Sequence, residues 1–103
     1  MKDFKAKLKC DFVEALHEIL EEVLVNIEPT GDDDKIFLAG LAEVKGRLYI
    51  KLGKRKEQYT VSFSPVQALA LRMLYNDVFR GQAPTYTTNR LRQIADEVHR
   101  HYS

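Results

Sequence analysis

The sequence has 103 residues, of which 45% are hydrophobic and 30% are charged, and its formal net charge is +1. This length and composition predict one helical domain, residues 1–103, with a hydrophobic core of its own. The single cysteine excludes an internal disulfide, and no apolar run reaches the length of about 18 residues that a membrane span needs. Residues 1–9 also lack the apolar stretch of a secretory signal, so we expect a cytoplasmic protein with no membrane partner.

Charge is distributed unevenly along the chain. Residues 1–9 hold four lysines against one aspartate, residues 10–34 hold nine acidic residues and no Lys or Arg, and residues 35–60 hold seven basic residues against two acidic ones. Two interpretations are open. An acidic helix pairs with basic residues inside the fold, or the two charges form opposed patches that meet partners. We favour pairing inside the fold as the simpler interpretation.

The first predicted element is an amphipathic helix from about Asp3 to Val25. Its apolar residues recur at spacings of three and four, which is the helical period: Phe4, Leu8, Phe12, Leu16, Ile19, Val23 and Ile27. The opposite face carries Glu14, Glu18 and Glu21. Like charges at these spacings each cost a few tenths of a kcal/mol, so basic side chains are expected nearby.

The next segment, residues 35–52, is compatible with two structures. Its apolar residues fit one helix face: Phe37, Leu41, Val44, Leu48 and Leu52. Three aspartates precede them and suit the positive end of a helix. Against a helix, Gly40 and Gly46 each cost about 1 kcal/mol relative to Ala in a helix interior.

The alternation of residues 48–52 and 59–63 instead favours a β-hairpin at 47–63, which would make the fold α+β. We favour a helix from Asp33 to about Leu52, followed by an extended segment over residues 57–63.

The most apolar part of the chain predicts a central helix that starts at Ser64. Ser64 stands at the N-cap, Pro65 follows at the first helical position, and Gln67 completes a capping box. Apolar residues then cover most of the helix, so a charge at Leu71 or Leu74 is expected to be among the most damaging substitutions.

A last, narrower amphipathic helix follows, with Thr87 or Thr88 as its predicted cap. The predicted fold is therefore mainly α. It is a small bundle of about four helices with a short extended or hairpin segment before the third.

The residues that could carry chemistry do not form a recognisable catalytic or metal motif. His17, Glu21, Cys10, His99 and His101 are of ligating types, but their spacing matches no zinc motif. Cys10 stands beside an aspartate, whose charge opposes a reactive thiolate, and no glycine-rich phosphate loop is present. We therefore expect no metal, no cofactor and no enzymatic activity.

Basic residues gather in one part of the chain, between residues 45 and 56. They are the candidate nucleic-acid contacts: Lys45, Arg47, Lys51, Lys54, Arg55 and Lys56. Tyr49 and Tyr59 are available for base stacking, and Arg90, Arg92 and Arg100 could extend the patch.

The sequence predicts two functions. The wide apolar stripe of the first helix and the apolar central helix favour a non-enzymatic interaction or assembly module, which binds a protein partner or a second copy as a homodimer. The alternative is an accessory nucleic-acid-binding protein that uses the basic cluster at 45–56.

Overall fold

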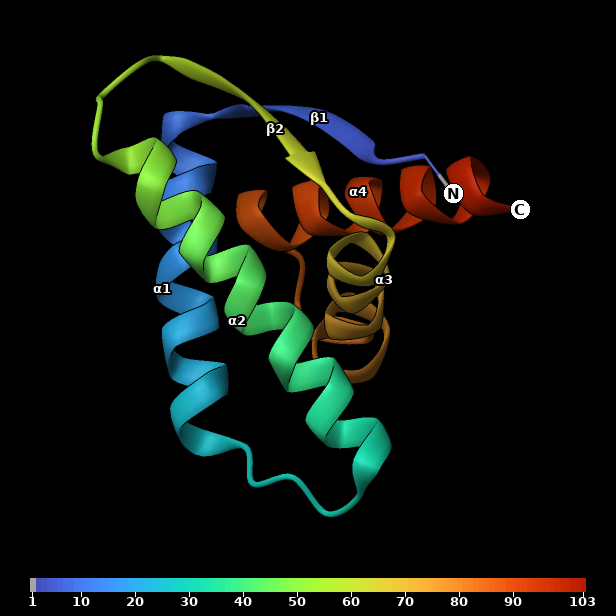
Figure 1. Ribbon diagram of the computed structural model, residues 1–103. Helices are drawn as coiled ribbons and strands as arrows, with labels where there is room; N and C mark the ends of the chain where they lie inside the picture. The colour runs from blue at the N-terminus through green and yellow to red at the C-terminus, as the bar shows by residue number, and fades with distance from the viewer. Residues whose placement is uncertain (1) are drawn as a thin grey trace.

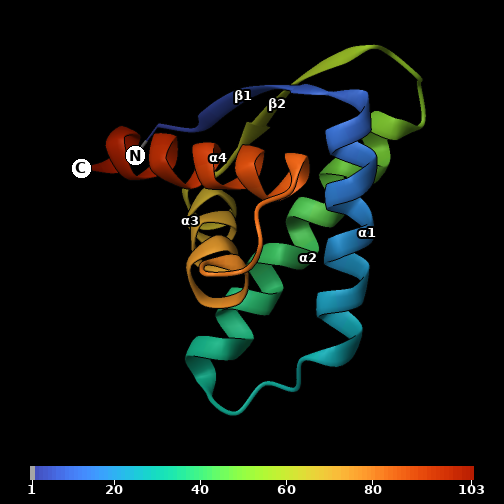
Figure 2. The same ribbon diagram turned by 180° about the vertical axis from the view of Figure 1, so that it is seen from behind.

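The computed structural model describes residues 2–103, which form four α-helices and a two-stranded antiparallel sheet (Figure 1, Figure 2). The elements are, in chain order, β1 (Phe4–Lys9), α1 (Cys10–Asn26), α2 (Asp32–Leu52), β2 (Gln58–Phe63), α3 (Pro65–Leu74), the π-helical turn η1 (Tyr75–Phe79) and α4 (Tyr86–Tyr102). The predicted mainly-α bundle of four helices, with an extended segment before the third, is confirmed. No helix within residues 2–103 is long and apolar enough to cross a membrane.

The chain begins with a strand, so the helix predicted from Asp3 to Val25 is wrong over its first third. Residues 4–9 alternate between buried and exposed and pair with β2, from Phe4 opposite Phe63 to Lys9 opposite Gln58. The helix α1 begins only at Cys10. Pairing with β1 satisfies backbone N–H and C=O groups of β2 that would otherwise lack partners.

The second segment is a helix, as favoured from the sequence, and the alternative hairpin at 47–63 is wrong. The partner of β2 is the distant strand β1 rather than residues 48–52. Gly40 lies where α2 meets α3, because a Cβ at this position would lie 2.9 Å from the Cβ of Ala70. The small residue therefore permits close packing of the two helices.

The central helix begins as predicted. The Ser64 hydroxyl accepts a hydrogen bond from the backbone N–H of Gln67 at 3.3 Å, and the Gln67 side chain accepts one from the backbone N–H of Ser64 at 3.0 Å. Leu71 and Leu74 are fully buried, where a charge is most costly. After η1, Gly81 adopts a φ of +90°, a conformation that side chains other than glycine rarely tolerate.

The N-cap of the last helix lies two residues before the first predicted cap, Thr87. Thr85 is the N-cap, and its hydroxyl accepts a hydrogen bond from the backbone N–H of Thr88 at 3.1 Å. The Thr88 hydroxyl in turn accepts one from the backbone N–H of Thr85 at 2.8 Å. The predicted caps Thr87 and Thr88 are therefore both wrong, although Thr88 completes the capping box that starts at Thr85.

The core lies between the four helices and the inner face of the sheet. The sheet lies along α4 and extends to the ends of α1 and α2, with β1 leading directly into α1 (Figure 1, Figure 2). Its inner face contributes buried side chains from both strands: Phe4, Ala6, Leu8, Tyr59, Val61 and Phe63. Its outer face is left to solvent, and this face carries the candidate site.

Candidate nucleic-acid interface

The outer face of β1 presents three lysines. Lys5, Lys7 and Lys9 are the exposed, alternate residues of the strand. Across the sheet they face the small or neutral residues Ser62, Thr60 and Gln58 respectively. Alternate residues of a strand are about 7 Å apart, so the lysines form an evenly spaced row of positive charges.

The loop between α2 and β2 brings more positive charge to the end of this row. It contains Lys54, Arg55 and Lys56, and all three side chains are exposed. The buried Tyr59 holds the loop in place, since its hydroxyl donates a hydrogen bond to the carbonyl of Lys54 and accepts one from the backbone N–H of Lys56, both at 3.0 Å. The loop is therefore positioned by the core of the protein.

A further hydrogen bond places the loop beside β1. The backbone N–H of Cys10, the residue after Lys9, donates to the carbonyl of Glu57 at 2.9 Å. Lys9, Arg55 and Lys56 together line an open depression of about 400 Å³. Lys51, Lys54 and Lys56 line a second one, of about 370 Å³, between the end of α2 and β2.

The six residues selected from the sequence do not all reach this surface. Lys51, Lys54 and Lys56 lie together at the end of α2 and in the loop. Lys45 instead points toward α1, where its Nζ lies 3.7 Å from a carboxylate oxygen of Glu21.

Two arginines of the predicted cluster occupy intermediate positions. Arg55 pairs with Glu14 at 3.3 Å, although four-fifths of its side chain remains exposed. Arg47 is exposed on α2, one turn before Lys51.

Pairing inside the fold therefore accounts for only part of the charge segregation. The acidic face of α1 meets the basic segment in the ion pairs Lys45–Glu21 and Arg55–Glu14. Within residues 2–103, eight lysines have no carboxylate oxygen within 4.0 Å of their ammonium nitrogen, and six of these lie on β1, at the end of α2 and in the loop before β2: Lys5, Lys7, Lys9, Lys51, Lys54 and Lys56. We call these six residues the basic surface.

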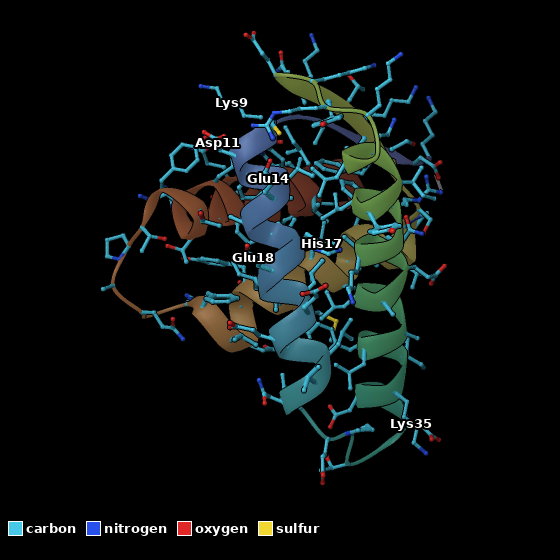
Figure 3. All side chains as sticks on the ribbon, turned by 90° about the vertical axis from the view of Figure 1, so that its left-hand side faces the viewer. Lys9, Asp11, Glu14, His17, Glu18 and Lys35 are labelled. Carbon is cyan, nitrogen blue, oxygen red and sulfur yellow. The ribbon has the colours of Figure 1, made fainter. Side chains whose placement is uncertain are left out.

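The acidic residues of α1 occupy a neighbouring but separate face. Figure 3 shows Lys9 at the start of α1 and Glu14 and Glu18 further along its outer side. Asp11 lies beside Lys9 and is the acidic residue of α1 that borders the basic surface. The two charges therefore form adjacent patches.

The predicted stacking by Tyr59 is wrong, because its side chain is only 3% exposed and its hydroxyl is bonded to the loop. Tyr49 is 70% exposed, but its ring lies 6.2 Å from the ring of His17, beside α1. The outward positions of both strands carry no aromatic residue. The sheet therefore offers no platform for stacked bases.

The arginines of α4 contribute little to the basic surface. Arg90 donates a hydrogen bond to the backbone carbonyl of Lys7 at 3.1 Å, so its guanidinium fastens α4 to β1. Arg92 pairs with Asp96 on its own helix at 3.7 Å. Arg100 is exposed and shares an open depression with Lys5, which leaves it as the arginine of α4 that extends the surface.

Sequence reasoning missed Lys5, Lys7 and Lys9 because it placed them on a helix. A signal for them exists in the alternation of FKAKLK, which is the period of a strand with one apolar and one basic face. Phe4 and Leu8 are four residues apart, so they also extend the helical pattern of apolar residues in α1. This longer pattern favours a helix over a strand.

Cys10 and His17, the other candidate residues, do not form a reactive or metal-binding site in the described chain. Burial raises the pKa of the Cys10 thiol, and its hydrogen bond to the Glu14 carboxylate, 3.3 Å long, raises this pKa further, so the nucleophilic thiolate is disfavoured. His17 lies 3.9 Å from Glu21, but no three His, Cys, Asp or Glu side chains within residues 2–103 gather in a way that could hold a metal ion.

The chain was compared with protein-family models, curated proteins and solved structures, and none of them matches. Its function is therefore inferred from its own surface.

Proposed function

We propose that this protein is a non-enzymatic binding module that contacts the phosphate backbone of nucleic acid through the basic surface. The observation that carries the proposal is the gathering of six lysines from β1, α2 and the loop before β2, with no carboxylate oxygen within 4.0 Å of their ammonium groups in the described chain. An ammonium group without an internal partner is free to replace a counterion on a phosphate.

The arrangement supports contact with the backbone of a duplex rather than with bases. Lysine ammonium groups and the hydroxyl of Thr60 are donors that suit phosphate oxygens. Stacking on aromatic rings is the usual means of holding single-stranded bases, and the sheet has no such ring. We therefore expect binding that is independent of sequence and stronger for duplex, which has the higher charge density.

The proposal predicts a steep dependence on salt. Each neutralised phosphate contributes about 0.9 to the slope of log affinity against log salt concentration. If all six lysines contact phosphates, the affinity falls about a thousandfold between 50 and 200 mM salt. Fluorescence anisotropy of the protein with a labelled mixed-sequence duplex, measured at both concentrations, gives this slope directly.

A matched pair of triple variants locates the interface. Replacing Lys5, Lys7 and Lys9 with Gln removes three charges from the basic surface. The control replaces Lys35, Arg80 and Arg92 with Gln, which removes the same charge from exposed positions outside it. Lys35 lies at the opposite end of α2 (Figure 3).

The two variants should differ in slope. We expect the first to reduce the slope by about 2.7 and the control to leave it unchanged. Replacing Lys54, Arg55 and Lys56 with Ala should also weaken binding. Equal losses in the surface and control variants, or no binding of the parent chain at 50 mM salt, would contradict the proposal.

A further inference from the structure

A second exposed surface lies between the first half of α2 and α3. It is an open groove of about 330 Å³, lined by Ile36, Phe37, Val66, Leu69, Ala70 and Met73, with Asp33 at its margin. Three of its apolar residues are strongly exposed, namely Ile36 at 62%, Val66 at 52% and Met73 at 40%. The other exposed large hydrophobic residues are distributed over α1, the second half of α2 and α4, so this groove is where they concentrate. We call it the apolar groove.

Packed helices fix the shape of the apolar groove. The helices α2 and α3 make their close approach at Gly40 and Ala70, where an added Cβ would lie 2.9 Å from the Ala70 Cβ. In Figure 1 the axis of α2 runs obliquely past α3, which is seen nearly end-on, so the two helices cross rather than lie parallel. Crossed helices diverge on either side of their contact, which leaves a groove between them. Both walls of this groove belong to helices that pack on the core.

The margin of the groove is negatively charged. Asp33 lines it, and Asp32 precedes Asp33 in the first turn of α2. Asp77, in η1, follows Met73 by four residues and is exposed. No Lys, Arg or His lines the groove. The apolar floor and acidic margin together call for an apolar partner with positive charge at its edges.

We propose that the apolar groove binds a basic amphipathic helix of another protein. The α3 wall, from Val66 to Met73, extends along about two helical turns, or about 10 Å. A helix laid beside it would offer apolar anchors at positions i, i+3, i+4 and i+7, with Lys or Arg on the flanks facing the aspartates.

The charge of the margin disfavours a second copy of this chain as the occupant. A two-fold dimer formed through the groove uses the same patch on both subunits, so it would bring two acidic margins into one interface. Like charges set against each other at an interface oppose association. The partner helix whose charge complements the acidic margin is therefore basic and comes from a different protein.

The probe for this proposal is a synthetic amphipathic peptide of about 14 residues, with Leu at i, i+3, i+4 and i+7 and Lys on the flanks. A labelled version is titrated with the full chain and followed by fluorescence polarisation. Two comparison peptides are a scrambled one and one with Glu in place of each Lys. We expect micromolar binding of the basic peptide and at least tenfold weaker binding of both others.

Two isoleucines of α2 supply a matched pair of variants. Ile36→Ser changes the apolar groove, whereas Ile50→Ser makes the same change at a residue that is 75% exposed near the basic surface. We expect the first to weaken peptide binding about tenfold and the second to leave it within twofold. Asp33→Asn should weaken it a few-fold and flatten its salt dependence. Circular dichroism checks that each variant remains folded.

Three results would overturn the proposal. They are equal peptide affinity of the Ile36 and Ile50 variants, no discrimination against the acidic peptide, and self-association of the parent chain in sedimentation that Ile36→Ser abolishes. The last result would make a second copy the occupant. The proposal does not depend on nucleic-acid binding, because Ile36 and Lys51 lie about 22 Å apart along α2 and different variants test the two surfaces.

Discussion

Two glycines in one helix serve different purposes. A Cβ at Gly40 would lie 2.9 Å from the Ala70 Cβ and 3.4 Å from the carbonyl oxygen of Val66, whereas a Cβ at Gly46 would have no heavy atom within 4 Å. The sequence alone predicts that both residues weaken the helix equally. The structure shows that only Gly40 makes a close interhelical approach, which is a relation that the local sequence does not contain.

This difference predicts opposite effects of one substitution. Gly46→Ala should raise the free energy of unfolding by about 0.5–1 kcal/mol, because alanine lowers the backbone entropy of the unfolded chain. Gly40→Ala has the same entropic advantage but forces α2 and α3 apart, and overpacking costs about 1–3 kcal/mol. We expect a net loss of about 1 kcal/mol for Gly40→Ala in urea denaturation. If both variants were stabilised alike, the close packing at Gly40 would be wrong.

The beginning of the chain shows where sequence patterns are ambiguous. Phe4 and Leu8 are four residues apart, a spacing that fits one face of a helix and also one face of a strand. The pattern continues through Phe12 in α1, so the helical interpretation was the longer and more regular one. What decides the structure is β2, whose residues pair with β1 residues 49 to 59 positions earlier, a pairing that no local pattern reveals.

The same reasoning explains how much of the candidate site was predictable. The cluster of Lys51, Lys54 and Lys56 followed from local sequence and lies together in the structure. The row on β1 required knowledge of the strand, and the loss of Lys45 to Glu21 required knowledge of how α1 packs on α2. Residues that are close in sequence were therefore easier to group than residues that the fold brings together.

Ala6 distinguishes the strand from the helix. In β1 its side chain is buried beneath the sheet, only 6% exposed, whereas on a helix it would lie opposite the stripe of Phe4 and Leu8 and face solvent. Ala6→Lys should therefore lower the free energy of unfolding by about 3 kcal/mol or more, since it buries a charge. Ala39→Lys, at an exposed position of α2, is the control and should change stability by less than about 0.5 kcal/mol. Equal stability of the two variants in urea would contradict the strand.

The segregation of acidic and basic residues along the chain can either stabilise or destabilise the fold. The ion pairs Lys45–Glu21 and Arg55–Glu14 join the acidic and basic segments, and both are at least partly exposed, so each contributes at most about 1 kcal/mol. Against them stand the like-charged rows on α1 and β1, where neighbouring charges repel. The balance of these terms decides how the stability of the free protein responds to salt.

We expect repulsion to dominate. The screening length falls from about 30 Å at 10 mM salt to about 8 Å at 150 mM, which weakens repulsion within each row. The free energy of unfolding should therefore rise by about 1 kcal/mol or less as NaCl increases over this range in urea titrations. The variant with Gln at Lys5, Lys7 and Lys9 should show a smaller rise, because one repelling row is gone. A fall in stability with salt would instead mean that attraction between the acidic and basic segments holds the fold together, and the basic surface would then already have its counterpart within the molecule.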